Sequence, residues 1–168
     1  MTAEIRAVVI TVSDACAAGA RADASGAALI ELLEETGARI VAREVVSDEL
    51  APLIEKLRAY AERADVNLIV TTGGTGLAPR DNTPEATRAV LEREAPGLAE
   101  AMRAETLRQT PSAMLSRGVC GVCAATLIVN LPGAPKAVRE CFAVIRPVLA
   151  HAVALVAGQT AHDEAKRT

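Results

Sequence analysis

Residues 68–76 read Leu68-Ile69-Val70-Thr71-Thr72-Gly73-Gly74-Thr75-Gly76, an apolar run that ends in a glycine-rich loop. In α/β folds such a loop brings bare backbone N–H groups up to an anion, most often a phosphate. The hydroxyl groups of Thr71, Thr72 and Thr75 add further hydrogen-bond donors. The loop matches neither the Walker A pattern nor the G-x-G-x-x-G dinucleotide fingerprint. The loop alone therefore leaves two interpretations, a phosphate site and a plain tight turn between strand and helix.

Acidic residues stand close to this loop. Asp81 lies in the segment Pro79-Arg80-Asp81-Asn82-Thr83-Pro84-Glu85-Ala86, where it could hold a divalent cation beside a phosphate or cap the helix that follows. Asp48 could likewise be a metal-binding acid or an ordinary acid in the first turn of a helix, beside the cap Ser47. Two carboxylates on one rim with a phosphate loop are what phosphoryl and nucleotidyl transfer use to hold Mg²⁺. Asp48 and Asp81 are thus the predicted catalytic and metal-binding residues.

Strands and helices alternate along the whole chain, and this order predicts a three-layer α/β/α fold with a mainly parallel sheet. One domain is expected over residues 1–158, followed by a polar tail at 159–168. Ser25 is expected to cap the second element, and Thr83 the helix after the glycine loop. Strands are predicted at 5–12, 39–46, 67–71 and 126–131, and helices at 26–36, 50–61, from 84, at 97–109 and from 135.

Polar residues follow four of the predicted strands. Parallel sheets of this kind bind ligands beyond the carboxyl ends of their strands. The four polar clusters are therefore expected to converge on one rim as a ligand site. They are Ser13-Asp14, Ser47-Asp48, the segment 72–81, and Pro132-Gly133.

Composition predicts an aliphatic core and opposes binding to nucleic acid. Hydrophobic residues make up 51% of the 168 residues, whereas aromatic residues make up 1%. Proteins that bind single-stranded nucleic acid use aromatic side chains on which the bases stack, and this chain has almost none. Its net charge of -3 would also repel a polyanion. The chain starts with neither a basic signal-peptide region nor an apolar run long enough to cross a membrane. A cytoplasmic protein without nucleic-acid or membrane partners is expected.

The pair Cys120-x-x-Cys123 is the one cysteine motif of the chain. It supplies two of the four ligands of a structural zinc site, and neither His151 nor His162 has zinc-finger spacing from it. Buried free thiols are therefore favoured over a zinc or redox motif.

Taken in order, these motifs resemble the molybdopterin adenylyltransferase family of molybdenum cofactor biosynthesis, which includes the G domains of gephyrin-like proteins. The resemblance runs from about residue 5 to residue 157. The motifs that carry it are Thr11-Val12-Ser13-Asp14, Asp23-x-Ser25-Gly26, Ser47-Asp48-Glu49, the glycine loop at 71–76, Ala78-Pro79-Arg80-Asp81, Thr83–Thr87, Glu94-Ala95-Pro96-Gly97, Met114-Leu115-Ser116-Arg117, and Asn130-Leu131-Pro132-Gly133.

The resemblance implies a molybdopterin-binding fold, a homotrimer, and transfer of AMP from MgATP to the terminal phosphate of molybdopterin, with release of pyrophosphate. The product would pass to a molybdate-inserting protein. By the resemblance, Asp48 and Asp81 are the two essential acids, and Ser116 with Arg117 belongs to the pterin site. The residues implied to contact the nucleotide or its phosphates are Ser13, Asp14, Thr72, Gly73, Gly74, Thr75, Gly76, Pro132 and Gly133.

The chain departs from the family pattern before the last strand. The family has Gly-hydrophobic-Arg-Gly-basic where this chain has Gly121-Val122-Cys123-Ala124-Ala125, so the expected arginine is Cys123. Loss of that cation favours an alternative function, a trimeric molybdopterin-binding scaffold without catalysis, unless Arg117 or Lys136 replaces it. Nucleotidyl transfer to another phosphorylated small molecule is a further alternative. A milder departure is Asn82, which stands where the family has an apolar residue.

Overall fold

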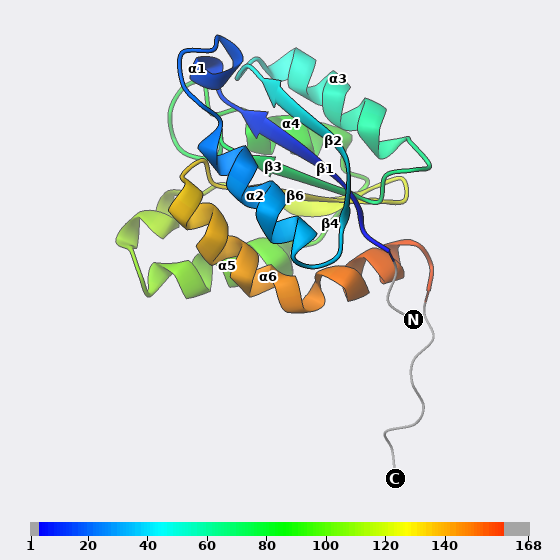
Figure 1. The fold of residues 1–168 in the computed structure, drawn as a ribbon. Helices are drawn as coiled ribbons and strands as arrows, with labels where there is room; N and C mark the ends of the chain where they lie inside the picture. Colours follow the sequence, from blue (N-terminus) through cyan, green and yellow to red (C-terminus); the bar gives the residue numbers. More distant parts are fainter. Residues whose placement is uncertain (1–3, 160–168) are drawn as a thin grey trace.

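The structure is a computed structural model that describes residues 4–159. Within these residues, six strands form one sheet in the order β2-β1-β3-β6-β5-β4 (Figure 1). The first four strands in this order run parallel, whereas β5 is antiparallel to β6 and β4 is antiparallel to β5. The strands span Arg6–Val12 (β1), Arg39–Val46 (β2), Leu68–Thr72 (β3), Arg93–Glu94 (β4), Cys120–Cys123 (β5) and Thr126–Leu131 (β6).

Helices cover both faces of the sheet, so the predicted three-layer α/β/α fold is confirmed. Helices α2, α5 and α6 pack on one face, and α3 and α4 pack on the other (Figure 1). None of the helices within residues 4–159 combines the length and apolar composition that a membrane crossing requires. The helices span Asp14–Ala17 (α1), Ala24–Glu34 (α2), Leu50–Ala61 (α3), Thr83–Val90 (α4), Pro96–Leu107 (α5) and Pro135–Val156 (α6), with a short 3-10 helix η1 at Pro111–Leu115.

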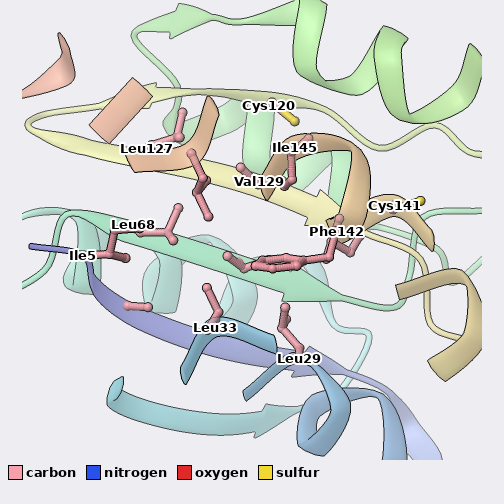
Figure 2. Close-up of a cluster of buried hydrophobic side chains, with 14 of the residues drawn as sticks. Ile5, Leu29, Leu33, Leu68, Cys120, Leu127, Val129, Cys141, Phe142 and Ile145 are labelled. Atoms are coloured by element: carbon pink, nitrogen blue, oxygen red, sulfur yellow. The ribbon is translucent and has the colours of Figure 1, made fainter. Parts of the chain in front are cut away.

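Two aliphatic cores lie on the two faces of the sheet, because successive strand residues point in opposite directions. In β1, Val9 belongs to the core beneath α2 and α6, whereas Val8 and Ile10 belong to the core beneath α3 and α4. Phe142 of α6, the one phenylalanine of the chain, is fully buried in the first core, among side chains from α2, β3 and β6 (Figure 2). Burial on both faces explains why the central strands read as continuous apolar runs.

Two helix starts differ from the sequence prediction. Helix α2 begins at Ala24 because Asp23, and not Ser25, caps it: Asp23 Oδ1 accepts a hydrogen bond from Gly26 N at 2.9 Å. Thr83 is the first residue of α4 and not its cap, because Asn82 occupies the cap position. The predicted polar tail lies, apart from Gln159, outside the described residues, as does His162.

The turn between β5 and β6 holds a backbone conformation that alanine disfavours. Cys123 pairs with Thr126, so Ala124-Ala125 forms a two-residue turn. Ala124 has a φ of 51°, and among residues 4–159 no other non-glycine residue has a positive φ. The left-handed region costs an L-residue about 1–2 kcal/mol. The structure therefore stores strain at the position where the family has glycine.

We expect Ala124→Gly to raise the free energy of unfolding by about 0.5–1 kcal/mol, because relief of this strain exceeds the extra chain entropy of glycine. Thermal melting should rise by about 2 °C. The matched control is Ala125→Gly, which relieves no positive φ and should lower the melting temperature. An equal decrease in both variants would show that Ala124 carries no strain.

Candidate functional site

A cavity of about 530 Å³ lies at the carboxyl ends of β1, β3 and β6. The arrowheads of β1 and β2 point toward this edge of the sheet, where α1 lies (Figure 1). Each of the four polar clusters contributes to the lining, through Ser13, Asp48, the segment 72–74 with Asp81, and Gly133. Asp14, Thr75, Gly76 and Pro132, which were also expected to contact the nucleotide, are not part of the lining.

The glycine loop has a conformation that side chains would prevent. Gly73 has a φ of 99°, and a Cβ there would lie 2.3 Å from the carbonyl oxygen of Val12. Gly74 has a φ of 64°, and its Cβ would lie 2.4 Å from the Thr83 hydroxyl and 3.3 Å from Asp48 Oδ1. A Cβ on Gly133 would lie 3.2 Å from the Gly73 Cα. Bare backbone at residues 73, 74 and 133 therefore lines the cavity beside Asp48.

Two threonine hydroxyls at this loop donate to backbone carbonyls, so the Thr72 hydroxyl is not the free oxyanion donor that was expected, whereas Thr71 is fully buried and outside the cavity lining. Thr72 Oγ1 donates to the Pro132 carbonyl at 2.7 Å, and Thr83 Oγ1 donates to the Gly73 carbonyl at 2.9 Å. Thr71 Oγ1 accepts from Asn130 Nδ2 at 3.0 Å. The buried Asn130 was not among the predicted residues, although its place in the Asn-Leu-Pro-Gly motif was a signal.

Asp48 and Asp81 share the cavity, as their strand-end positions predicted. Asp48 Oδ2 accepts a hydrogen bond from Asp14 N at 2.8 Å, and Asp81 Oδ2 accepts one from Ala78 N at 3.0 Å. Asp81 therefore closes its own loop and does not cap α4, which removes that alternative. Partial burial raises the pKa of Asp48 above its usual value, and the nearby charges of Asp14 and Asp81 raise it further.

This pair of acids fits a cation that arrives with a phosphate ligand. Within residues 4–159, no three side chains of His, Cys, Asp or Glu gather into a metal cage. Mg²⁺ is usually bound by one or two carboxylates together with substrate phosphates and water, so two acids suffice. The Oδ1 atoms of Asp48 and Asp81 make no hydrogen bond to any described residue. The unfavourable charge on Asp48 would be relieved by a cation at that position.

Asp14 is committed to other residues. Arg80 donates to its carboxylate through Nε at 2.6 Å and through Nη2 at 3.0 Å, and the same carboxylate accepts Asp48 N at 3.0 Å. The paired Arg80 guanidinium lowers the pKa of Asp14. Asp14 was expected to contact the nucleotide, whereas the structure uses its carboxylate to hold Arg80 and Asp48.

The loop between α1 and α2 adds Arg21, which sequence inspection missed. Arg21 lines the cavity and donates from Nη2 to Ser13 Oγ at 3.2 Å. Ser13 also caps α1 by accepting from Cys16 N at 3.2 Å. Gly19, two residues earlier, is a sequence signal for a loop here, but it does not indicate that the Arg21 side chain turns toward the cavity.

Ser116 and Arg117 lie apart from this cavity. Both line a second hollow of about 440 Å³ between α4, α5 and β5, together with Arg88 and Arg103. Arg117 Nε donates to the Gly76 carbonyl and Nη2 to the Asp81 carbonyl, both at 2.7 Å, and Nη1 pairs with Glu85. The Arg117 guanidinium thus braces the glycine loop and the backbone of Asp81, a structural role that the sequence did not predict.

Comparison with known proteins agrees with this geometry. A model of the family described as a probable molybdopterin binding domain matches residues 8–151, a span that includes the whole cavity. The chain belongs to this family. Its members take part in molybdenum cofactor biosynthesis, so the resemblance drawn from the sequence motifs is confirmed.

Curated relatives and solved structures support the same family. The molybdopterin adenylyltransferase of Helicobacter pylori strain J99 is 40% identical over 152 residues, which cover 89% of this chain and 86% of that protein. The molybdenum cofactor synthesis protein cinnamon of Drosophila melanogaster is 48% identical over 149 residues, but this chain spans only 25% of its length. An adenylyltransferase is a nucleotidyltransferase, and the chain groups with this class of enzyme.

Among solved structures, the molybdopterin biosynthesis enzyme MoaB of Thermus thermophilus superimposes with a TM-score of 0.87 at 51% identity. The match covers 92% of this chain and 97% of that chain. The molybdopterin-binding fold class expected from the motifs is therefore confirmed.

The position of Cys123 changes the meaning of the departure from the family pattern. Cys123 pairs with Thr126, the first residue of β6, whereas the cavity lies beyond the last residue of that strand. Cys123 and Cys120 are buried free thiols in the cores on opposite faces of the sheet, as predicted. The missing arginine therefore lies at the far end of the sheet and removes no cation from the cavity. Lys136, offered as its substitute, is exposed and pairs with Glu140.

Proposed function

We propose that this chain transfers AMP from ATP to the terminal phosphate of molybdopterin, giving adenylyl-molybdopterin and pyrophosphate. One observation carries the proposal: Asp48 and Asp81 line the same cavity as the bare backbone of Gly73 and Gly74. Acids beside a loop that can offer backbone N–H groups to a phosphate are what nucleotidyl transfer uses. The substrate is inferred from the names of relatives such as the Helicobacter pylori molybdopterin adenylyltransferase, 86% of which is covered by this chain.

In the proposed reaction, an oxygen of the molybdopterin phosphate forms a bond to the α-phosphorus of ATP. The bond from that phosphorus to the bridging oxygen of the β-phosphate breaks, and pyrophosphate leaves with the electron pair. The backbone N–H groups of Gly74 and Gly133, two residues that line the cavity, orient the nucleotide phosphates, and this orientation supplies much of the acceleration. Mg²⁺ held by Asp48 and Asp81 would neutralise charge on the α-phosphate and the leaving group.

The second hollow is the proposed place for the pterin. It adjoins the cavity through Arg117, whose guanidinium contacts the backbone of both Gly76 and Asp81. Ser116 lies beside it and presents a hydroxyl that can bond to a pterin edge. Residues 1–158 are proposed to act as one domain in a cytoplasmic homotrimer that delivers its product to a molybdate-inserting protein.

The competing function is a molybdopterin-binding scaffold without catalysis. Its main support was Cys123, and the location of that residue at the far end of the sheet removes this support. The two acids remain in one cavity, which a scaffold has no need to maintain. The enzyme is therefore favoured over the scaffold.

The test is incubation of the purified protein with molybdopterin, ATP and Mg²⁺, followed by mass spectrometry of the pterin fraction. Adenylyl-molybdopterin that appears only when all three are present supports the transferase. Tight molybdopterin binding without product would support the scaffold. Product from a different phosphorylated acceptor, supplied in a parallel incubation, would move the assignment to another nucleotidyl transfer.

A further inference from the structure

We propose that Arg80 and Asn82, the two chain neighbours of Asp81, are positioning residues that fix Asp48 relative to Asp81. The inference rests on the proposed function for its kinetic test, but its structural test needs no substrate. The two acids come from different loops: Asp48 follows β2, and Asp81 lies between β3 and α4. Some contact between these loops must set the separation of the two carboxylates.

Asp48 is held first by a reciprocal pair of hydrogen bonds with Asp14. Asp14 N donates to Asp48 Oδ2 at 2.8 Å, and Asp48 N donates to Asp14 Oδ1 at 3.0 Å. Each aspartate thus accepts the backbone N–H of the other. This pair fixes both the backbone of residue 48 and the rotation of its carboxylate, leaving Oδ1 toward Gly74.

Arg80 connects this pair to the loop that carries Asp81. Its guanidinium makes two bonds to the Asp14 carboxylate, at 2.6 and 3.0 Å, and Nη2 also donates to Glu49 Oε1 at 3.0 Å. A two-bond arginine–carboxylate pair defines an orientation as well as a distance. Arg80 is therefore bonded both to Asp14, the hydrogen-bond partner of Asp48, and to Glu49, the residue that follows Asp48 in the chain.

Asn82 supplies a second, direct connection. Its Nδ2 donates to the Asp48 carbonyl oxygen at 3.0 Å. Residues 80 and 82 thus hold residue 48 from either side of residue 81, so the Asp48–Asp81 geometry is fixed by Asp81's own neighbours. An apolar side chain at position 82, as in the family pattern, cannot make this bond.

Replacing Arg80 or Asn82 is expected to lower the rate of turnover and to change the free energy of unfolding only slightly. The Arg80 and Asp14 side chains are 55% and 45% exposed, and exposed ion pairs contribute little to folding. A misplacement of reacting groups by about 1 Å can nevertheless lower turnover by up to about 10²-fold. Loss of a positioning residue should therefore lower kcat and raise the Mg²⁺ requirement while the KM for ATP changes little.

The test compares Arg80→Ala, Asn82→Ala and the double variant with wild type. In the protein without ligands, the backbone amides of Asp14 and Asp48 should exchange with solvent at least about 10-fold faster in Arg80→Ala, as followed by NMR. In Asn82→Ala the Asp48 amide should respond and the Asp14 amide less so. With substrates, kcat should fall about 10-fold in each single variant. Arg80→Lys should retain more turnover than Arg80→Ala but less than wild type, because lysine lacks the planar guanidinium that makes two bonds to one carboxylate.

The matched control is Arg63→Ala. Arg63 makes a similar two-bond pair with Asp65, at 2.9 and 2.7 Å, in the turn before β3 and far from the cavity. This variant should change neither amide exchange at residues 14 and 48 nor turnover.

Two outcomes would overturn the inference. Unchanged amide exchange in both Arg80→Ala and Asn82→Ala would show that these residues do not hold Asp48. A raised KM for ATP with unchanged kcat would make Arg80 a ligand of the nucleotide instead. If wild-type protein forms no adenylyl-molybdopterin, the proposed function fails alone, because the exchange experiment still decides whether the two residues fix Asp48.

Discussion

Asp81→Asn should abolish adenylyl transfer while leaving the fold and molybdopterin binding intact. The substitution keeps the size of the side chain and an oxygen for the Ala78 N–H, which Asp81 Oδ2 accepts at 3.0 Å. It removes one of the two carboxylate charges in the cavity that are proposed to hold Mg²⁺. Turnover should fall by at least about 10³-fold, equal to about 4 kcal/mol in the barrier. Mass spectrometry of the product, with thermal melting as the check on folding, measures both effects.

Asp65→Asn is the control for this prediction. Asp65 is an exposed acid that also takes a hydrogen bond through its carboxylate, but from Arg63 and at the opposite end of β3. Its replacement should leave turnover within about two-fold of wild type, because exposed pairs contribute little. Wild-type turnover in Asp81→Asn would remove Asp81 from the mechanism and return the scaffold to first place.

Gly73→Ala should damage both stability and nucleotide binding. The methyl group would meet the Val12 carbonyl oxygen at 2.3 Å, and the φ of 99° is unfavourable for any side chain. Strain and overpacking together should cost about 3 kcal/mol and lower the melting temperature by about 10 °C. Any protein that still folds would have to move the loop away from β1, so ATP affinity measured by calorimetry should also fall.

A matched substitution at Gly97 separates this local effect from a general loss of glycine. Gly97 lies in α5, and a Cβ there would meet nothing within 4 Å. Gly97→Ala should therefore stabilise the protein slightly, by about 0.5–1 kcal/mol, through helix propensity. If Gly73→Ala melts as wild type does, the loop is more adaptable than its contacts indicate.

The parts of the fold that the sequence predicted are those with long apolar runs. β2 and β6 have the predicted bounds, and β1 and β3 differ by one residue at their ends. The strands β1, β3 and β6 are buried on both faces and leave a continuous hydrophobic signal, whereas the edge strand β2 is only partly buried and is marked by its β-branched residues. Strand β5 was missed because Cys120–Cys123 contains a glycine and no alternating pattern. Strand β4 has two exposed residues and exists through its pairing with β5, which no local pattern reveals.

The candidate site shows the same division between local and distant information. The approach of Asp48 to Asp81 followed from a general rule about strand ends. The hydrogen-bond partners of Thr72 and Arg117 could not be predicted in this way. A hydroxyl or guanidinium group can donate to a ligand or to a carbonyl oxygen distant in the sequence equally well. Thr72 bonds to a residue 60 positions away and Arg117 to one 41 positions away. Such choices depend on the assembled sheet, so motif inspection assigned both residues to ligands.

The contacts between the glycine loop and the end of β6 also limit when the loop can first take its final shape during synthesis of the chain. Gly73 N donates to the Leu131 carbonyl at 3.1 Å, and Thr72 Oγ1 donates to the Pro132 carbonyl at 2.7 Å. During translation the glycine loop leaves the ribosome long before these partners are made. A nascent chain that stops short of residue 131 contains the loop and its contacts with Thr83 and Arg117, but it lacks the contacts with Leu131 and Pro132. The glycine loop therefore reaches its final shape only after β6 has been made, and under the proposed function ATP would bind completed chains in preference to incomplete ones.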